Sequence, residues 1–290
     1  MKQPGLEPGP PREPVRRHRR RLLPGFGLSF GITVSYLSLL VLIPLAFVFL
    51  RAASMGPAAF LEALTAPRTL AAYRLSFLAA LAAAAINAVF GFIIAWVLER
   101  YRFPGRRLLD ALVDLPFALP TAVAGIVLTA LFARDGWIGR FLEAAGIHAV
   151  YTPLGVTLAL IFIGLPFVVR SVQPVLHDLD PTLEEAAASM GAKQWFTFRR
   201  VILPELLPSL FTGFTLALAR GLGEYGSVIF IAGNIPMRSE ITPLLIVIQL
   251  EQYDYAAATA IASVFLVASF GLLLAINLLS RQARRAMQSA

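Results

Sequence analysis

The sequence has 290 residues, of which 58% are hydrophobic and 14% are charged, and its mean hydropathy is +0.73. These values exclude an ordinary soluble domain and indicate a membrane protein. The net charge of +8 requires no nucleic-acid partner, because membrane proteins place basic residues on one side, where they attract anionic lipid. The absence of cysteine excludes disulfides and thiolate metal sites.

Six apolar runs are long enough to approach the roughly 20 residues that a helix needs to cross a bilayer. The predicted transmembrane helices occupy about residues 28–50, 75–98, 108–133, 154–170, 206–231 and 257–280. The fourth is short, and Arg170 at its end is expected to reach the interface by snorkelling. A further apolar stretch, 241–250, is too short to span and predicts a helix at the interface. The expected fold class is all-α, a polytopic membrane protein.

Lysine and arginine are distributed unevenly between the two sides that six spans define. The side with both termini and the segments 99–107 and 170–205 holds eighteen of them, and the other side holds six. Positive residues are enriched in the cytoplasmic loops of membrane proteins. We therefore expect both termini to be cytoplasmic.

The chain is expected to comprise four parts. Residues 1–21, with many prolines and arginines, predict a disordered basic cytoplasmic tail on the lipid surface. Residues 22–74 hold the first transmembrane helix and a periplasmic loop, which contains a short amphipathic stretch at 58–64. Residues 75–280 form the transmembrane core, and residues 281–290 form a second cytoplasmic tail.

A polar segment between the fourth and fifth spans has the features of a capped helix. Asp180 can cap a helix with Pro181 at its first position; alternatively, Thr182 and Glu185 can form a capping box. Gly191 is expected to end this helix. A side chain at that position is expected to obstruct the helix end or the socket of a partner into which the helix docks.

The same segment carries the spacing EAA-x3-G-x9-[IV]-x-LP, which resembles the cytoplasmic signature of permease subunits of ABC importers. The resemblance implies a type I importer (MetI-like) permease fold, covering about residues 75–280. It also implies that residues 181–192 form a coupling helix that inserts into a cleft of a separate ATPase subunit. The residues expected to couple to the ATPase are Glu184, Glu185, Ala186, Ala187, Gly191 and Pro204.

The fifth span contains two charges, Arg220 and Glu224, four residues apart on one helix face, where they can pair. A central charge costs about 2.5–3.5 kcal/mol on insertion scales, so the pair is expected to face the bundle. The expected pathway or gate residues are Arg220, Gly223, Glu224, Tyr225, Gly226 and Ser227. Either the pair is structural and holds a bend at the gate, or Arg220 contacts an anionic substrate. We favour the structural role, because a Gly-Glu-[Tyr/Phe]-Gly motif is similar across permeases for different oxyanions.

Four strings in the last third of the chain make the resemblance more specific. They are Gly-Glu-Tyr-Gly-Ser (223–227), Phe-Ile-Ala-Gly-Asn (230–234), Glu-Ile-Thr-Pro-Leu-Leu-Ile (240–246) and Leu-Glu-Gln-Tyr-Asp-Tyr (250–255). In succession they resemble the T-type permease subunit of sulfate/thiosulfate importers. This implies a bacterial inner membrane and, as partners, a second (W-type) permease subunit, two ATP-binding subunits and a periplasmic sulfate/thiosulfate-binding protein.

Three alternatives remain open. One is a molybdate or tungstate ABC permease, and a second is an ATP-independent secondary anion transporter. A membrane enzyme is the weakest, because no Ser/His/Asp set or metal-binding histidine pair occurs. No Gly-x4-Gly-Lys-[Ser/Thr] loop occurs either, so we expect no nucleotide, cofactor or metal site and no catalytic residue in this chain.

Overall fold

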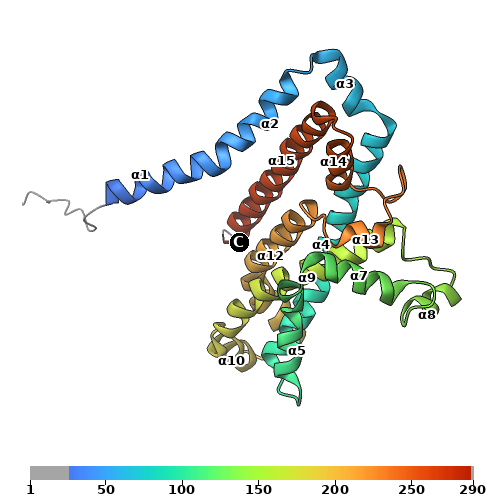
Figure 1. Cartoon of the computed structure of the whole chain (residues 1–290). Coiled ribbons are helices and arrows are strands. Elements are labelled where there is room, and N and C mark those ends of the chain that lie inside the picture. Colours follow the sequence, from blue (N-terminus) through green and yellow to red (C-terminus); the bar gives the residue numbers. More distant parts are fainter. Residues whose placement is uncertain (1–25, 289–290) are drawn as a thin grey trace, which may run out of the picture. The chain divides into compact units, whose positions relative to one another are not determined.

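The computed structural model describes residues 26–288, and every regular element in that range is helical (Figure 1). The all-α class expected from composition is therefore confirmed for these residues. The chain divides into two units, Met1–Ala46 and Phe47–Ala290. The disordered tail expected at 1–21 lies outside the described residues.

The described part of the first unit is α1 (Phe26–Leu37), a π-helical turn η1 (Ser38–Leu42) and the start of α2 (Ile43–Ala53). No residue of α1 is buried, although the helix is mostly apolar. A helix that is hydrophobic all round is typical of a segment that lipid or another protein surrounds. The run Phe26–Ala53 has 28 residues and a mean hydropathy of 2.4, in agreement with the expected first span.

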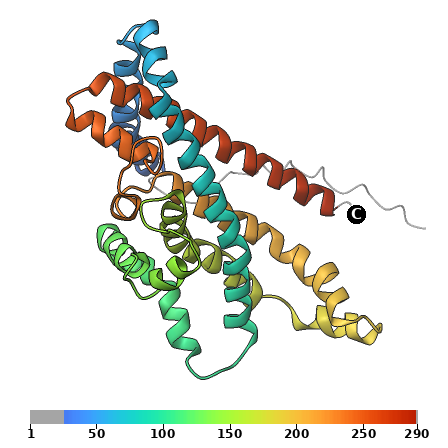
Figure 2. The ribbon, with the colours of Figure 1, turned by 90° about the vertical axis from the view of Figure 1, so that its right-hand side faces the viewer.

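Three long helices form the centre of the second unit: α4 (Pro67–Arg100), α9 (Pro153–His177) and α12 (Leu203–Leu222). They lie against one another, with α9 in contact with both others (Figure 2). Small residues make this approach close. A Cβ on Gly91 of α4 would lie 2.9 Å from the Val168 Cβ, and a Cβ on Gly213 of α12 would lie 2.8 Å from the Val168 Cα. The packing therefore follows the small-residue rule of membrane helices.

Three further helices of the second unit pack against this centre or against one another. They are α3 (Pro57–Thr65), α14 (Thr242–Glu251) and α15 (Tyr255–Gln288). The hydroxyl of Tyr73 on α4 donates to the carbonyl oxygen of Ile261 on α15 at 2.8 Å. The amphipathic stretch 58–64 and the short apolar stretch 241–250 thus both form helices, as expected. The last helix continues through most of the expected tail at 281–290.

The expectation of one continuous helix over 108–133 is wrong. Three short helices take its place: α5 (Arg106–Val113), α6 (Leu115–Ala118) and α7 (Thr121–Phe132). Leu119 is extended, with φ −86° and ψ 135°. The cause is local, because the residue before a proline, here Pro120, is sterically disfavoured in the helical region.

The fifth span also differs from the expected helix over 206–231. It begins earlier, as α11 (Gln194–Thr197) and a π-helical turn η2 (Phe198–Ile202) that lead into α12. It ends at Leu222, and a separate short helix, α13 (Val228–Ala232), follows a turn. The turn carries most of the expected gate residues.

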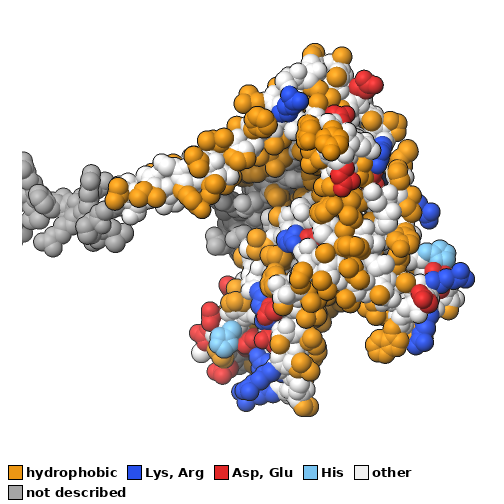
Figure 3. Space-filling model, viewed as in Figure 1, with side chains coloured by type: hydrophobic (Ala, Val, Ile, Leu, Met, Phe, Trp, Pro, Cys, Tyr) orange, Lys and Arg blue, Asp and Glu red, His pale blue; other side chains and the backbone are white. Residues whose placement is uncertain are grey.

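Five helical runs in the described residues are long and apolar enough to cross a membrane. Together with the interrupted third segment they agree approximately with the six expected spans. In the second unit, charged side chains gather near α5, α10 (Pro181–Ser189) and α8 (Gly139–Ala144), whereas the flanks are mainly hydrophobic (Figure 3). This distribution is the one that a bilayer imposes.

Candidate functional site

The polar helix α10 begins as one of the two expected capping schemes requires. The Asp180 carboxylate accepts a hydrogen bond from the backbone N–H of Thr182 at 2.9 Å, and Pro181 occupies the first helical position. This bond lowers the pKa of Asp180 below its usual value, because it favours the ionised carboxylate. The N-cap is thus Asp180, and the alternative capping box at Thr182 does not form.

The other end of α10 closes in a Schellman motif at Gly191, which has a φ of +80°. The Gly191 N–H donates to the Ala188 oxygen at 2.9 Å, and the Ala192 N–H donates to the Ala187 oxygen at 3.0 Å. A Cβ on Gly191 would meet no atom within 4 Å. The expectation that a side chain at Gly191 would obstruct the helix end is therefore wrong for contacts within this chain. The left-handed backbone is the reason for the glycine, because L-residues other than asparagine and aspartate rarely adopt it.

One face of α10 carries exposed apolar side chains that no described part of the chain covers. Leu183, Ala186 and Met190 follow the i, i+3, i+7 spacing of one helix face, and Met190 is 83% exposed. Ala187 is buried beneath the helix, and Glu185 is exposed. Leu183 and Met190 were missed in the sequence, although the helical spacing itself could have identified them.

Ionic contacts tie α10 and the end of α9 to α4. The Arg100 guanidinium contacts the Glu184 carboxylate at 2.6 Å and lies over the Trp96 ring at 5.2 Å from its centroid. Next along α4, Glu99 contacts His177 of α9 at 2.9 Å. Of the two neighbouring glutamates, the structure thus places Glu184 in an internal contact and leaves Glu185 facing outward.

The expected pair in the fifth span forms between Arg220, in the last turn of α12, and Glu224, just beyond the end of the helix. The Arg220 guanidinium contacts one oxygen of Glu224 at 2.5 Å. The other Glu224 oxygen accepts hydrogen bonds from the backbone N–H and the hydroxyl of Ser227, both at 2.9 Å. Glu224 is 1% exposed, whereas the Arg220 side chain is 34% exposed. Glu224 therefore holds the turn after α12 and leaves one side of Arg220 open.

Close packing against the Thr121 side chain of α7 explains one of the glycines in this turn. A Cβ on Gly226 would overlap the Thr121 hydroxyl at 2.2 Å, and a Cβ on Gly125 would overlap the Ser227 oxygen at 2.4 Å. Gly223 has no such requirement, since only one atom lies within 4 Å, at 3.9 Å. Tyr225 is partly buried against the core. The turn and the first two turns of α7 therefore form one packed unit.

Arg170 is the centre of an ion-pair cluster that the sequence did not reveal. It does not snorkel as expected, but binds both carboxylate oxygens of Asp114 at 2.6 and 2.8 Å and one oxygen of Asp110 at 2.7 Å. These contacts hold the interrupted third segment against α9. Two aspartates within an apolar segment were the available signal, because such charges need partners.

A second ion pair that the sequence did not reveal lies at the first turn of α4, at the other end of this helix from Arg100. Arg68 binds both carboxylate oxygens of Glu240 at 2.7 and 2.8 Å, and Glu240 is 2% exposed. The segment before α14 is thereby fixed to the start of α4. Ser76 and Thr242 form a buried hydrogen bond beside it, at 3.0 Å.

These features define a class of protein. It is a polytopic helical membrane protein with ion pairs between its helices and a short, capped polar helix between two long apolar ones. The family of binding-protein-dependent transport system inner membrane components matches residues 87–287, and the chain belongs to this family, that of ABC importer permeases. Its members are transport components rather than enzymes. Helix α10 and the fifth span both lie within the matched residues.

Relatives match nearly the whole chain. The chain is 51% identical over 267 residues to the sulfate transport system permease protein CysT of Escherichia coli, covering 92% of this chain and 96% of that protein. It is 49% identical to the protein of the same name from Synechocystis, covering 89% and 90%. The similarity therefore extends beyond the general family to one type of permease.

Solved structures support the fold. A bacterial ABC transporter for the import of alginate superposes with a TM-score of 0.73 at 16% identity, covering 88% of this chain and 96% of that chain. A chain of the MetNI methionine ABC transporter superposes with a TM-score of 0.52 at 19% identity, covering 76% and 94%. At these identities the likeness concerns the fold alone.

Proposed function

We propose that this chain is a transmembrane permease subunit of an ATP-driven sulfate/thiosulfate importer of a bacterial inner membrane. The observation that carries the proposal is the similarity to sulfate transport system permeases, at 51% identity over most of both chains. Other relatives with similar names reach 44–49% identity over 85–91% of this chain. The molybdate and secondary-transporter alternatives are not favoured, because these relatives are named for sulfate transport and the family depends on a binding protein.

The proposed assembly has five chains. This permease pairs with a second, W-type permease, two ATP-binding subunits and a periplasmic sulfate/thiosulfate-binding protein. A bacterial alginate transporter with the same fold, at a TM-score of 0.74, is in complex with a ligand-bound periplasmic protein.

Helix α10 is proposed to be the coupling helix. It has rigid ends, fixed by Asp180 and Gly191, and an apolar exposed face. The Arg100–Glu184 contact gives it a connection to α4, in addition to its covalent connection to α9 and α12. A movement imposed on α10 by an ATPase would therefore reach all three central helices.

The turn after α12 is proposed to be part of the gate. Glu224 has three polar contacts within the turn and is buried, which supports the structural role rather than a direct substrate contact. Arg220 keeps one side open, so it is the group of this pair that an anion could reach.

The test of the function is uptake of labelled sulfate by vesicles that contain all five chains. We expect uptake that requires ATP, is inhibited by vanadate, and is competed by thiosulfate more strongly than by molybdate. Vesicles that lack only this permease serve as the control. Stronger competition by molybdate than by thiosulfate would contradict the proposed substrate specificity. Uptake that vanadate does not inhibit would contradict the proposal that the importer is driven by ATP.

A further inference from the structure

The segment from α11 into η2 has two opposite faces. Its inner face is buried: Thr197 and Ile202 are 8% and 4% exposed, and Phe198 packs edge-on against Trp96 at 5.4 Å between ring centroids. Its outer face carries Trp195 and Phe196, which are 69% and 56% exposed. Large aromatic side chains on the outside of a membrane protein are typical of the interface between hydrocarbon and water.

Two exposed arginines continue this outer face. Arg199 and Arg200 follow Trp195 and Phe196 by four residues, and neither guanidinium group makes an ion pair or a hydrogen bond to a side chain that the structure describes. The exposed carboxylate that follows them, Glu205, pairs with neither arginine. Guanidinium groups bind phosphate oxygens in a planar, bidentate manner. The pair is therefore free to hold a phosphate.

The length of the apolar stretch that follows the arginines bears on their depth in a bilayer. The largely apolar stretch 201–222 follows them, and about 22 helical residues extend roughly 33 Å, close to the roughly 30 Å hydrocarbon thickness. If this stretch crosses the bilayer, Arg199 and Arg200 lie at its boundary, beside the lipid headgroups.

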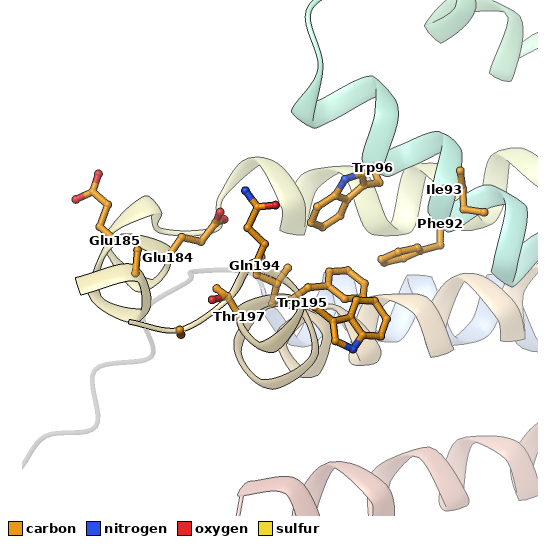
Figure 4. Close-up of a pocket in the computed structure, with 12 residues that line it drawn as sticks. Phe92, Ile93, Trp96, Glu184, Glu185, Gln194, Trp195 and Thr197 are labelled. Carbon is orange, nitrogen blue, oxygen red and sulfur yellow. The ribbon is translucent and has the colours of Figure 1, made fainter. Parts of the chain in front are cut away.

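A cavity opens next to the arginines. It has a volume of about 820 Å³, and its mainly apolar lining comes from α4 and from the α11 segment, with Phe92, Trp96 and Trp195 among its walls (Figure 4). A smaller groove of about 350 Å³ is lined by Trp195, Phe196, Arg199 and Arg200. Trp195 lines both, so the basic groove and the apolar cavity are adjacent.

The charges around the cavity differ at its two ends. Glu184 and Glu185 of α10 line the end away from the aromatic walls (Figure 4). Arg100 neutralises Glu184, so Glu185 is the carboxylate that repels an anionic group, whereas Arg199 and Arg200 attract it. The arrangement thus fits a molecule with an anionic head and an apolar tail, oriented in one direction.

We propose that this surface binds an anionic phospholipid, with its phosphate between Arg199 and Arg200 and one acyl chain in the cavity past Trp195. Occupancy of the site would depend on the anionic-lipid content of the membrane, and the bound lipid would contact the α11–η2 segment between α10 and α12. Binding does not depend on which side of the membrane the segment faces.

The test measures the lipid bound to the full chain by native mass spectrometry. The delipidated chain is titrated with phosphatidylglycerol or with phosphatidylcholine of the same acyl chains. The Arg199→Gln/Arg200→Gln variant is expected to bind phosphatidylglycerol about 30-fold more weakly. Its loss of phosphatidylcholine binding is expected to be smaller, because the choline cation offsets the charge of the phosphate. Arg199→Lys/Arg200→Lys keeps the charge but not the bidentate geometry, so it should bind with intermediate affinity, which separates loss of charge from misfolding.

Arg102→Gln/Arg107→Gln is the matched control. These two arginines are also exposed and make no ion pair within the described range, and their removal changes the net charge equally. Equal phosphatidylglycerol binding by the Arg199/Arg200 variant and this control would overturn the proposal. Displacement of the lipid by millimolar glycerol phosphate would indicate a soluble phosphate ligand instead. Unchanged lipid binding with loss of ATPase co-purification would assign the arginines to the ATPase.

Discussion

The two carboxylate oxygens of Glu224 hold the turn after α12 in different ways. One oxygen accepts hydrogen bonds from the backbone N–H and the hydroxyl of Ser227, and the other contacts the Arg220 guanidinium. Motif spacing predicted the pairing of Arg220 with Glu224, because residues four apart are neighbours on a helix. It did not predict the role of Ser227, because the sequence does not show that the helix ends at Leu222.

A double-mutant cycle on this pair distinguishes the two roles that the sequence left open. Breaking a fully buried ion pair costs about 3–5 kcal/mol, and less is expected here because Arg220 is a third exposed. If the pair is structural, Glu224→Gln together with Arg220→Gln should express and transport sulfate better than Arg220→Gln alone. Sulfate uptake and expression level are the measurements. Normal expression without any recovery of uptake in the double variant would assign Arg220 to the substrate.

The ordering of substitutions at Gly191 separates backbone strain from obstruction of a docking socket. The left-handed conformation costs an ordinary L-residue roughly 1–2 kcal/mol, whereas asparagine adopts it more readily. Gly191→Asn is therefore expected to retain more sulfate uptake and more bound ATPase than Gly191→Ala, despite its larger side chain. The opposite order would mean that side-chain size in a partner's socket decides, as the sequence alone suggested.

At the scale of elements, apolar length predicted the long helices well and the interrupted segment poorly. The runs around α4, α9 and α15 were found because hydrophobic length is a local property of the sequence. The interruption between α5 and α7 has a local part, Pro120, and a non-local part. The non-local part is Arg170, 56 residues after Asp114, and its contact becomes visible only when α9 packs beside α5 and α6.

The same limit applied to α10. Its first residue, Pro181, and the glycine that closes it were predicted, because helix capping depends on neighbouring residues, although two N-caps were left open and the helix ends at Ser189 rather than at 192. Its connection to α4 through Arg100 joins residues 84 apart and could not be predicted.

Charge reversal tests whether this connection transmits movement between α10 and α4. An exposed ion pair stabilises a protein by only about 0.2–1 kcal/mol, so Arg100→Glu should change thermal stability little. It should nevertheless lower ATP-driven sulfate uptake several-fold, because Glu184 then repels α4. Adding Glu184→Arg should restore part of the uptake. Arg102→Glu, at an exposed position without an ion pair in the described residues, is the control and should have a smaller effect. Equal loss in both single variants would rule out a specific connection.

At the scale of the whole molecule, the interrupted third segment determines the topology. Ser54 precedes α3, and Ser189 ends α10, so α4, the interrupted segment and α9 lie between them. If all three cross the membrane, the two serines lie on opposite sides. If the interrupted segment enters and returns on one side, they lie on the same side. The charge distribution predicts opposite sides, with Ser189 in the cytoplasm.

Single cysteines provide this measurement directly, because the natural chain has no cysteine. Ser54→Cys and Ser189→Cys are matched, since both hydroxyls are exposed and each donates one hydrogen bond to a backbone oxygen three or four residues earlier. A membrane-impermeant maleimide should label Ser54→Cys in intact spheroplasts and should label Ser189→Cys only after the membrane is opened. Labelling of both in intact spheroplasts would show that the interrupted segment does not cross. Labelling of Ser189→Cys alone would reverse the orientation and place α10 away from any cytoplasmic ATPase.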